Sequence, residues 1–140
     1  MKNKVSLTTN YPKQTDTMEG KEEITKGDYL KYHWMIIRRP VGWYCAYIKL
    51  WKKHPLEIVL DTEGYDGCDV DCHGGLTFGG KRKDKVFSSG YWIGWDYAHV
   101  GDYTAYHHPH LGLDDDKRWT FDEVLFEVHE VIDQLTEKYL

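Results

Sequence analysis

The sequence contains no apolar run that approaches the roughly 18 residues needed to cross a bilayer as a helix. Its start, MKNKVSLTTNYPKQTDT, also lacks the apolar core of a secretory signal. We therefore expect a cytoplasmic protein without a membrane partner.

An excess of positive charge is absent too. The chain has 18 Lys and Arg against 23 Asp and Glu, which gives a formal net charge of -5. Proteins bind DNA and RNA through dense positive surfaces that displace counterions, so this balance argues against polymeric nucleic acid as a partner. A small anion needs only one local cluster. The only run of three basic residues is Lys81-Arg82-Lys83, with Lys85 just beyond it.

Cysteine is scarce, with three residues in the whole chain. This number is odd, and the spacing Cys68-x3-Cys72 differs from the C-x2-C of common zinc sites, so reduced thiols are the simplest interpretation.

The P-loop motif G-x4-G-K-[ST] and the dinucleotide fingerprint G-x-G-x-x-G are missing as well. We expect no cofactor.

What the sequence does contain is typical of one globular domain. Its 140 residues are 41% hydrophobic and 29% charged, and six Trp and eleven Tyr can build a core. Residues 1–28 are polar and lack periodicity, which predicts a flexible or extended N-terminal arm. Residues 29–140 are expected to form a single α+β domain.

Aromatic and β-branched residues indicate an antiparallel sheet. Residues 34–38 and 43–51 flank the turn residues Pro40-Val41-Gly42, and this pattern predicts a β-hairpin. Residues 86–98 predict a further strand, in which Gly94 marks a bulge or a close approach of another chain segment. The residues expected on one side of that strand are Tyr91, Ile93, Trp95 and Tyr97.

The region between these strands is harder to assign. Residues 52–67 are expected to be a long connection with a short ordered piece over 58–60. Residues 69–73 alternate between polar and apolar, with Val70 and Cys72 on one face, which predicts a half-buried strand.

The C-terminal end carries the clearest helix signal. Thr120 and Glu123 have the spacing of a capping box, and apolar residues then repeat with a helical period. We expect this amphipathic helix to cover the sheet, which gives an α+β fold. The apolar positions are Val124, Leu125, Val128, Val131, Ile132, Leu135 and Tyr139.

The segment His73-Gly74-Gly75-Leu76-Thr77-Phe78-Gly79-Gly80 is a candidate binding loop. Its glycines let the backbone approach a partner and direct N–H groups at an anion, with a hydroxyl from Thr77 and a positive field from the basic run. The same glycines also suit a β-bulge and a hairpin turn without any ligand. His73 favours a functional role, because imidazole can donate, accept or ligate a metal.

A second candidate region, residues 94–103, gathers Asp96, His99 and Asp102 at a strand end, where binding sites often lie. Together with His73 these residues can converge on a divalent metal. No recognised ligand spacing supports that use, so we predict no metal site. His99 can instead act as a general base oriented by either carboxylate.

Aromatic residues in the same region allow a third use. They can stack on a nucleotide base while the histidines contact phosphate or ribose. The structural alternative places the aromatics in the core and the carboxylates at loop caps. Residues 106–110, which include three histidines, are expected to be a solvated loop. The aromatics concerned are Trp92, Trp95, Tyr97 and Tyr103.

The segments DVDCHGGLTFGG and YWIGWDYAHVGD resemble a family of small, largely uncharacterised bacteriophage and prophage proteins. Members carry D-V-x-x-H-G-G-L-T-[FY] and then W-[FI]-G-[FW]-D-x-A-H-x-G-D. The upstream GWYCAYIKLWKKHPL is similar to the family's G-Y-x-G-[YV]-V-x-[VI]-P-x-G-H-P-L-[YF] region, so the likeness covers residues 42–103. The KRKDK loop departs from it, because relatives are less basic there.

The resemblance implies a phage-encoded protein in the cytoplasm of a bacterial host cell. It also implies that the motif residues, Gly101 included, belong to one site. No catalytic residue carries over, because the family's role is undefined. Some small phage proteins bind host factors, and others sequester or cleave nucleotide signals of bacterial immunity. By analogy with these proteins, we expect an anti-defence role.

We therefore predict a protein that binds and sequesters a small anionic, nucleotide-derived ligand such as an immune signal. The alternatives are a small hydrolase or phosphodiesterase that uses His and Asp residues, and a protein–protein inhibitor of a host factor; a homo-oligomer is compatible with each. One site requires His73 and His99 to lie within about 12 Å, the span that one small ligand bridges. The predicted ligand-binding residues are His73, Gly74, Gly75, Thr77, Trp95, Asp96, His99, Asp102 and Tyr103.

Overall fold

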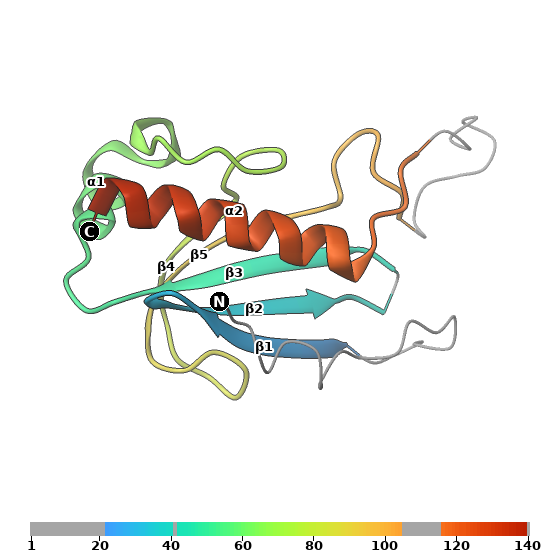
Figure 1. Cartoon of the computed structure of the whole chain (residues 1–140), viewed down its shortest axis with the longest axis horizontal. Helices are drawn as coiled ribbons and strands as arrows, with labels where there is room; N and C mark the ends of the chain where they lie inside the picture. The colour runs from blue at the N-terminus through green and yellow to red at the C-terminus, as the bar shows by residue number, and fades with distance from the viewer. Residues whose placement is uncertain (1–21, 41, 105–115, 140) are drawn as a thin grey trace.

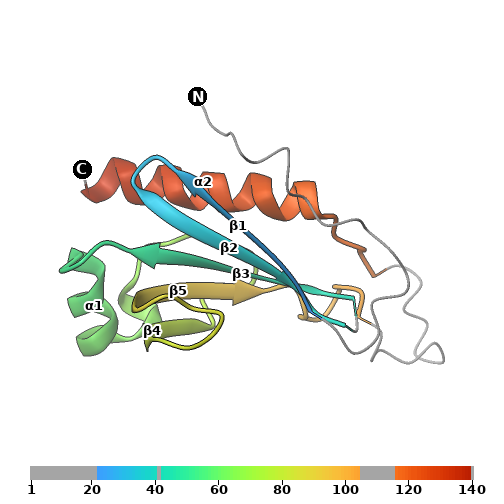
Figure 2. The ribbon, with the colours of Figure 1, turned by 90° about the horizontal axis from the view of Figure 1, so that it is seen from below.

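The computed structural model describes residues 22–40, 42–104 and 116–139. Five strands form one antiparallel sheet in the order β1-β2-β3-β5-β4, and a long C-terminal helix lies across one face of it (Figure 1). Seen from below, helix and sheet form two layers (Figure 2). The predicted α+β fold is confirmed. The elements are β1 (Glu23–Tyr29), β2 (Tyr32–Arg38), β3 (Tyr44–Leu50), α1 (Pro55–Glu63), the 3-10 turn η2 (Tyr65–Gly67), β4 (Phe78–Arg82), β5 (Gly90–Asp96) and α2 (Phe121–Tyr139).

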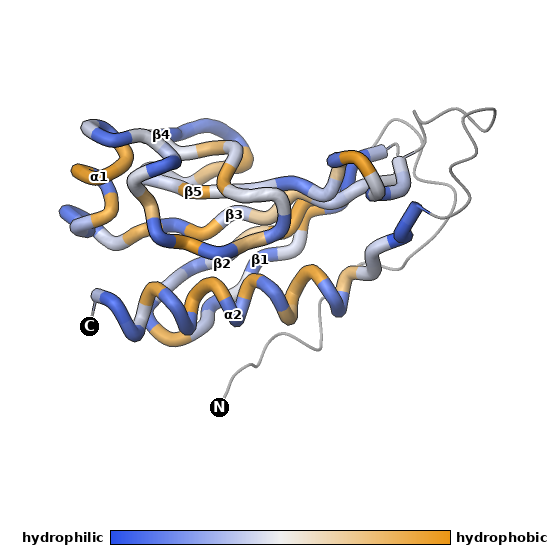
Figure 3. Tube along the Cα trace, turned by 90° about the horizontal axis from the view of Figure 1, so that it is seen from above, coloured by the Kyte–Doolittle hydropathy of each residue, from blue (hydrophilic) through white to orange (hydrophobic). Residues whose placement is uncertain are grey.

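Helix α2 begins with the predicted capping box. The Thr120 Oγ1 accepts from the Glu123 N–H at 3.2 Å, and the Glu123 Oε1 accepts from the Thr120 N–H at 3.0 Å. Hydrophobic positions recur along the helix in Figure 3, as an amphipathic surface requires. Those that pack against the sheet are fully buried: Val124, Val128, Val131, Ile132 and Leu135.

Both faces of the sheet carry apolar side chains. Ile93 and Trp95 of β5 join the main core on the α2 side, whereas Trp92 joins a smaller cluster on the opposite face, under Phe87 of the β4–β5 loop. The predicted division of β5 into two faces is confirmed. Gly94 is a point of close approach, because a Cβ there would lie 2.5 Å from the Tyr47 ring.

The sheet begins inside the predicted N-terminal arm. Strand β1 pairs with β2 from Glu23 onward, so the last part of that arm belongs to the domain. Residues 1–21 lie outside the described residues. Only Thr25 of β1 is buried. Strand β1 is polar and joins the edge of the sheet through its backbone hydrogen bonds to β2. Because its apolar residues do not alternate, the sequence pattern did not predict a strand here.

The predicted connection over 52–67 is wrong, because Pro55–Glu63 forms helix α1. His54 caps the helix, with its Nδ1 accepting from the Leu56 N–H at 3.0 Å, and Pro55 occupies the first turn, where its missing N–H is not needed. Only Leu56 and Leu60 of the helix are buried. Proline at a helix start and proline in a turn look alike in a single sequence.

The predicted strand over 69–73 is also wrong, although its alternation is real. Val70 and Cys72 do pack on the core. The backbone partners, however, come from α2 side chains: Gln134 accepts from the Asp71 N–H at 2.8 Å and donates to the Asp71 carbonyl at 2.7 Å. Because the Gln134 side chain satisfies the backbone N–H and carbonyl of Asp71, this extended segment does not pair with a strand of the sheet.

Candidate functional site

His73 and His99 lie together. His73 ends the extended segment along α2, and His99 lies in the loop after β5, yet their ring centroids are 5.5 Å apart. This is well inside the 12 Å that one shared site requires. Asp102 completes a cluster, hereafter the His–Asp cluster, in which one ligand atom from each residue lies within 4.8 Å of the other two.

Asp102 is the buried centre of this cluster, with 3% of its surface exposed. The His73 Nε2 lies 2.9 and 2.8 Å from its two carboxylate oxygens. The His99 backbone N–H donates at 2.9 Å and the Trp119 Nε1 at 2.8 Å. Burial raises the pKa of Asp102, but these hydrogen bonds outweigh it and hold the pKa below its ordinary value. Asp102 is therefore an ionised carboxylate at neutral pH.

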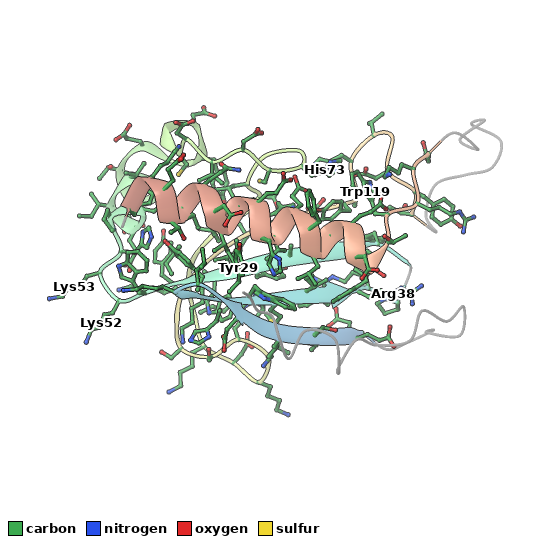
Figure 4. The ribbon with its side chains drawn as sticks, in the orientation of Figure 1. Tyr29, Arg38, Lys52, Lys53, His73 and Trp119 are labelled. Carbon is green, nitrogen blue, oxygen red and sulfur yellow. The ribbon has the colours of Figure 1, made fainter. Side chains whose placement is uncertain are left out.

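Aromatic rings fix the orientation of His73. Its ring stacks on Tyr97 at a centroid distance of 4.8 Å and an interplanar angle of 5°, and Trp119 meets it edge-on at 4.8 Å. Figure 4 shows His73 and Trp119 side by side above α2. The Tyr97 hydroxyl donates to Glu127 and accepts from the Trp95 Nε1 at 3.1 Å. Burial, together with the hydrogen bond to Glu127, raises the pKa of Tyr97 far above its usual value, so the ring stays neutral.

His99 occupies a position that only a glycine neighbour allows. A Cβ at Gly74, where φ is +69°, would lie 2.4 Å from the His99 Cε1. The His99 Nδ1 is buried and lies 3.5 Å from both the Asp96 Oδ1 and the Asp102 Oδ2, without a hydrogen bond to any described residue. Asp96 also accepts from the Thr77 hydroxyl at 3.4 Å.

Other predicted residues do not face the cluster. Trp95 has 1% of its surface exposed, and Tyr103 instead has the guanidinium of Arg118 over its ring at 3.9 Å. Gly75 adopts φ +82° with open space around it. Of the two alternatives left open for the aromatics, Trp92, Trp95 and Tyr97 follow the structural one, because all three are core residues. The histidines of residues 106–110 lie outside the described residues.

Sequence reasoning missed Trp119 and Glu127. Trp119 directly precedes the α2 capping box, and Glu127 lies at the end of the second turn of the helix. Trp119 contacts His73 and Asp102 directly, whereas Glu127 accepts from Tyr97, which stacks on His73. No local pattern in the sequence marks either residue as part of these surroundings.

The basic run does not contribute to the His–Asp cluster. Thr77 lies beside Gly94, next to the cluster, whereas Lys81 pairs with Tyr91 at the other end of the β4–β5 ladder. Four residues of extended strand place them roughly 13 Å apart. The prediction that the basic run contributes positive charge near Thr77 and the His–Asp cluster is therefore wrong. The cluster's own surroundings, with Asp96 and Glu127, are acidic.

A large cavity lies at that other end of the sheet, with a volume of about 790 Å³. Seven Lys and Arg side chains line it, against the single carboxylate of Glu57. In Figure 4 Lys52 and Lys53 extend from this end away from the body of the fold. We call it the basic cavity; its cationic residues are Lys31, Lys49, Lys52, Lys53, Lys81, Arg82 and Lys83.

Most of these cations lack a counter-charge within the described residues. Arg82 pairs with Asp84 at 3.0 Å, and the Lys49 Nζ donates to the Ser88 hydroxyl at 3.1 Å. The remaining five lysines make no ion pair with any residue that the structure describes. Positive charge is thus concentrated here in a chain whose net charge is -5.

Comparison with known proteins gives no match to a protein family model, to a curated protein or to a solved structure. Among the described helices, none combines the length and the apolar content that a bilayer span requires. The chemistry of the two sites rests on their own residues.

Proposed function

We propose that the protein binds and sequesters a small, multiply charged anion of the nucleotide class, and that the basic cavity holds it. The observation that carries this proposal is the gathering of seven cationic side chains around one cavity with a single carboxylate. The ligand class is the one predicted from the sequence. The proposed site is different, because the basic residues lie away from the His–Asp cluster.

Electrostatics favours an anion at this place. Lys31, Lys81 and Lys83 line the cavity without an ion pair to any described residue, and phosphate oxygens would reduce their mutual repulsion. Each hydrogen bond to a charged group contributes about 1.5–3 kcal/mol, so three or four lysine–phosphate contacts would offset much of the entropic cost of association, about 4–15 kcal/mol.

The size and walls of the cavity suit a nucleotide. About 790 Å³ falls within the roughly 300–1,000 Å³ typical of small-molecule sites. Trp51, which is half-buried, lines it and offers aromatic surface to a base. Sequestration of a bacterial immune signal, a role expected from the class of small phage proteins, is one biological use that such binding would serve.

Calorimetric titration with ADP-ribose, a cyclic dinucleotide and inorganic pyrophosphate tests the proposal. We expect binding of at least one of them, weakened about tenfold or more in the Lys81→Glu, Lys83→Glu double variant. Lys85→Glu is the matched control, because Lys85 is exposed in the same loop but does not line the cavity. Equal affinities in the double variant and the control, or no binding of any probe, would refute the proposal.

Hydrolysis of a nucleotide bound at the His–Asp cluster, instead of in the basic cavity, is the second candidate function. The pairing of His73 with the buried Asp102 favours it, since a carboxylate-oriented imidazole can serve as a general base. Incubation with each probe, followed by heat release and chromatography, separates the two functions. Intact ligand supports sequestration, whereas product that disappears in a His73→Gln variant supports hydrolysis.

A further inference from the structure

We propose that His73, His99 and Asp102 bind one divalent transition-metal ion of the zinc class. Their ligand atoms lie within 4.8 Å of one another, and the three residues come from the segment along α2 and the loop after β5. Two imidazoles and one carboxylate form a donor set that suits zinc and neighbouring transition metals. This site is separate from the basic cavity and independent of the proposed anion binding.

The distances within the cluster are close to those of a metal site. The Asp102 Oδ2 lies 2.8 Å from the His73 Nε2 and 3.5 Å from the His99 Nδ1. A tetrahedral zinc ion with bonds of about 2.0–2.1 Å separates its donor atoms by roughly 3.3 Å. The two distances from Asp102 are within about 0.5 Å of this value, and the two histidine nitrogens, which lie within 4.8 Å of each other, would approach by at most about 1.5 Å to complete the three ligands.

The His99 Nδ1 gives an independent reason. It is a buried polar atom without a hydrogen-bond partner among the described residues. Leaving such an atom unsatisfied destabilises the fold, because burial removes its hydrogen bonds to water. Its nearest polar neighbours are two carboxylate oxygens, of Asp96 and Asp102, each at 3.5 Å. A cation among these atoms would supply the missing partner.

A second layer of residues holds the ligands in place. Trp119 donates to the Asp102 Oδ1 at 2.8 Å, which leaves Oδ2 directed at the histidines, and Tyr97 stacks on His73. Metal ligands in proteins are oriented by outer hydrogen bonds of this kind. With three protein ligands the ion keeps one open position, as catalytic zinc sites do, and Asp96 lies beside the cluster.

Titration of the chelator-treated, full-length protein with Zn²⁺ and Co²⁺ tests the inference. We expect one equivalent of Zn²⁺ to bind, with affinity lowered at least about 100-fold in His73→Gln and in Asp102→Asn and about 10-fold in Trp119→Phe. His99→Gln serves as a further ligand variant, because His99 is partly exposed and its loss disturbs the fold less than that of buried Asp102. Bound Co²⁺ should show the visible bands of nitrogen and oxygen ligation without a thiolate charge-transfer band.

Two histidine controls make the result specific. His33→Gln removes an exposed histidine of β2, and a variant with Gln at His107, His108 and His110 removes the histidine run. Both should keep the wild-type Zn²⁺ affinity. The inference is overturned if circular dichroism shows His73→Gln and His99→Gln folded and their affinity is unchanged, if the histidine-run variant loses the site, or if the wild type binds neither ion.

Discussion

At the residue scale, two adjacent glycines have different functions beside His99. Gly74 and Gly75 both have positive φ, +69° and +82°. A side chain at Gly74 would strike the His99 ring, whereas nothing lies within 4 Å of a Cβ at Gly75. Gly74 is needed for both backbone conformation and space, and Gly75 for conformation alone.

Alanine at each position separates these two requirements. Gly75→Ala should lower the free energy of unfolding by about 1–2 kcal/mol through backbone strain. Gly74→Ala should cost about 1–3 kcal/mol more, because the added methyl group overpacks against His99. Urea denaturation measures both values, and the NMR signals of the His99 ring should shift only in Gly74→Ala. Equal losses in the two variants would show that the contact with His99 has no energetic weight.

At the element scale, helix α1 depends on a buried, neutral histidine. His54 has 1% of its surface exposed, accepts from the Leu56 N–H, and lies 2.8 Å from the Tyr32 hydroxyl through its Nε2. Burial lowers the pKa of His54 from 6.5 to about 4. The unfolded chain therefore binds a proton between these pH values that the folded protein does not.

Stability should consequently fall as the pH decreases from 6.5 to about 4. A shift of this size corresponds to roughly 3 kcal/mol of unfolding free energy. His54→Asn keeps a helix-capping side chain but removes the titration, so its unfolding free energy should depend less on pH over this range. Urea denaturation of both proteins at pH 7 and pH 4.5 makes the comparison. Parallel pH profiles would contradict the assignment.

Helix α2 stabilises the sheet through one stripe only. Leu135 is fully buried, whereas Phe126 on the same helix is 65% exposed. Leu135→Ala should lower the free energy of unfolding by about 2–5 kcal/mol, and Phe126→Ala should change it by about 0.5 kcal/mol or less. Chemical denaturation distinguishes them. A large loss in Phe126→Ala would mean that its exposed side chain has a partner.

At the scale of the whole molecule, the two sites lie at opposite ends of β5. Tyr91 lines the basic cavity, and Asp96 lies beside the His–Asp cluster. Five residues of strand separate them by roughly 17 Å, about twice the Debye length at physiological ionic strength. Carboxylate oxygens of Asp96 and Asp102 lie 3.5 Å from the His99 Nδ1 at one site, and seven basic side chains line the other, which suits a cation and an anion respectively.

The two sites should therefore act independently. The Lys81→Glu, Lys83→Glu variant should keep its Zn²⁺ affinity within about twofold, and His73→Gln should keep its anion affinity within the same limit. Calorimetry on both variants with both ligands checks this. A larger cross-effect would mean that a single ligand or a conformational change connects the ends of the sheet.

Local patterns in the sequence correctly predicted the C-terminal helix with its cap, the β2–β3 hairpin and the two faces of β5. These features depend on residues a few positions apart, through side-chain periodicity and short hydrogen bonds. The same reasoning failed for residues 55–63 and 69–73. There the outcome depended on a distant tyrosine and glutamine, Tyr32 and Gln134.

The sequence by itself also selected His73, His99 and Asp102 as candidates, from residue type and from a family resemblance. Only the tertiary structure decided that they meet around one buried carboxylate, because Trp119 and Tyr97 reach them from α2's start and β5's end. It likewise decided that the basic run faces a different cavity. Strand register carries Lys81 away from Thr77, and cations from three separate segments gather where β3 and β4 end. Contacts between residues of distant segments depend on how the helix packs on the sheet, and a short stretch of sequence does not determine this packing.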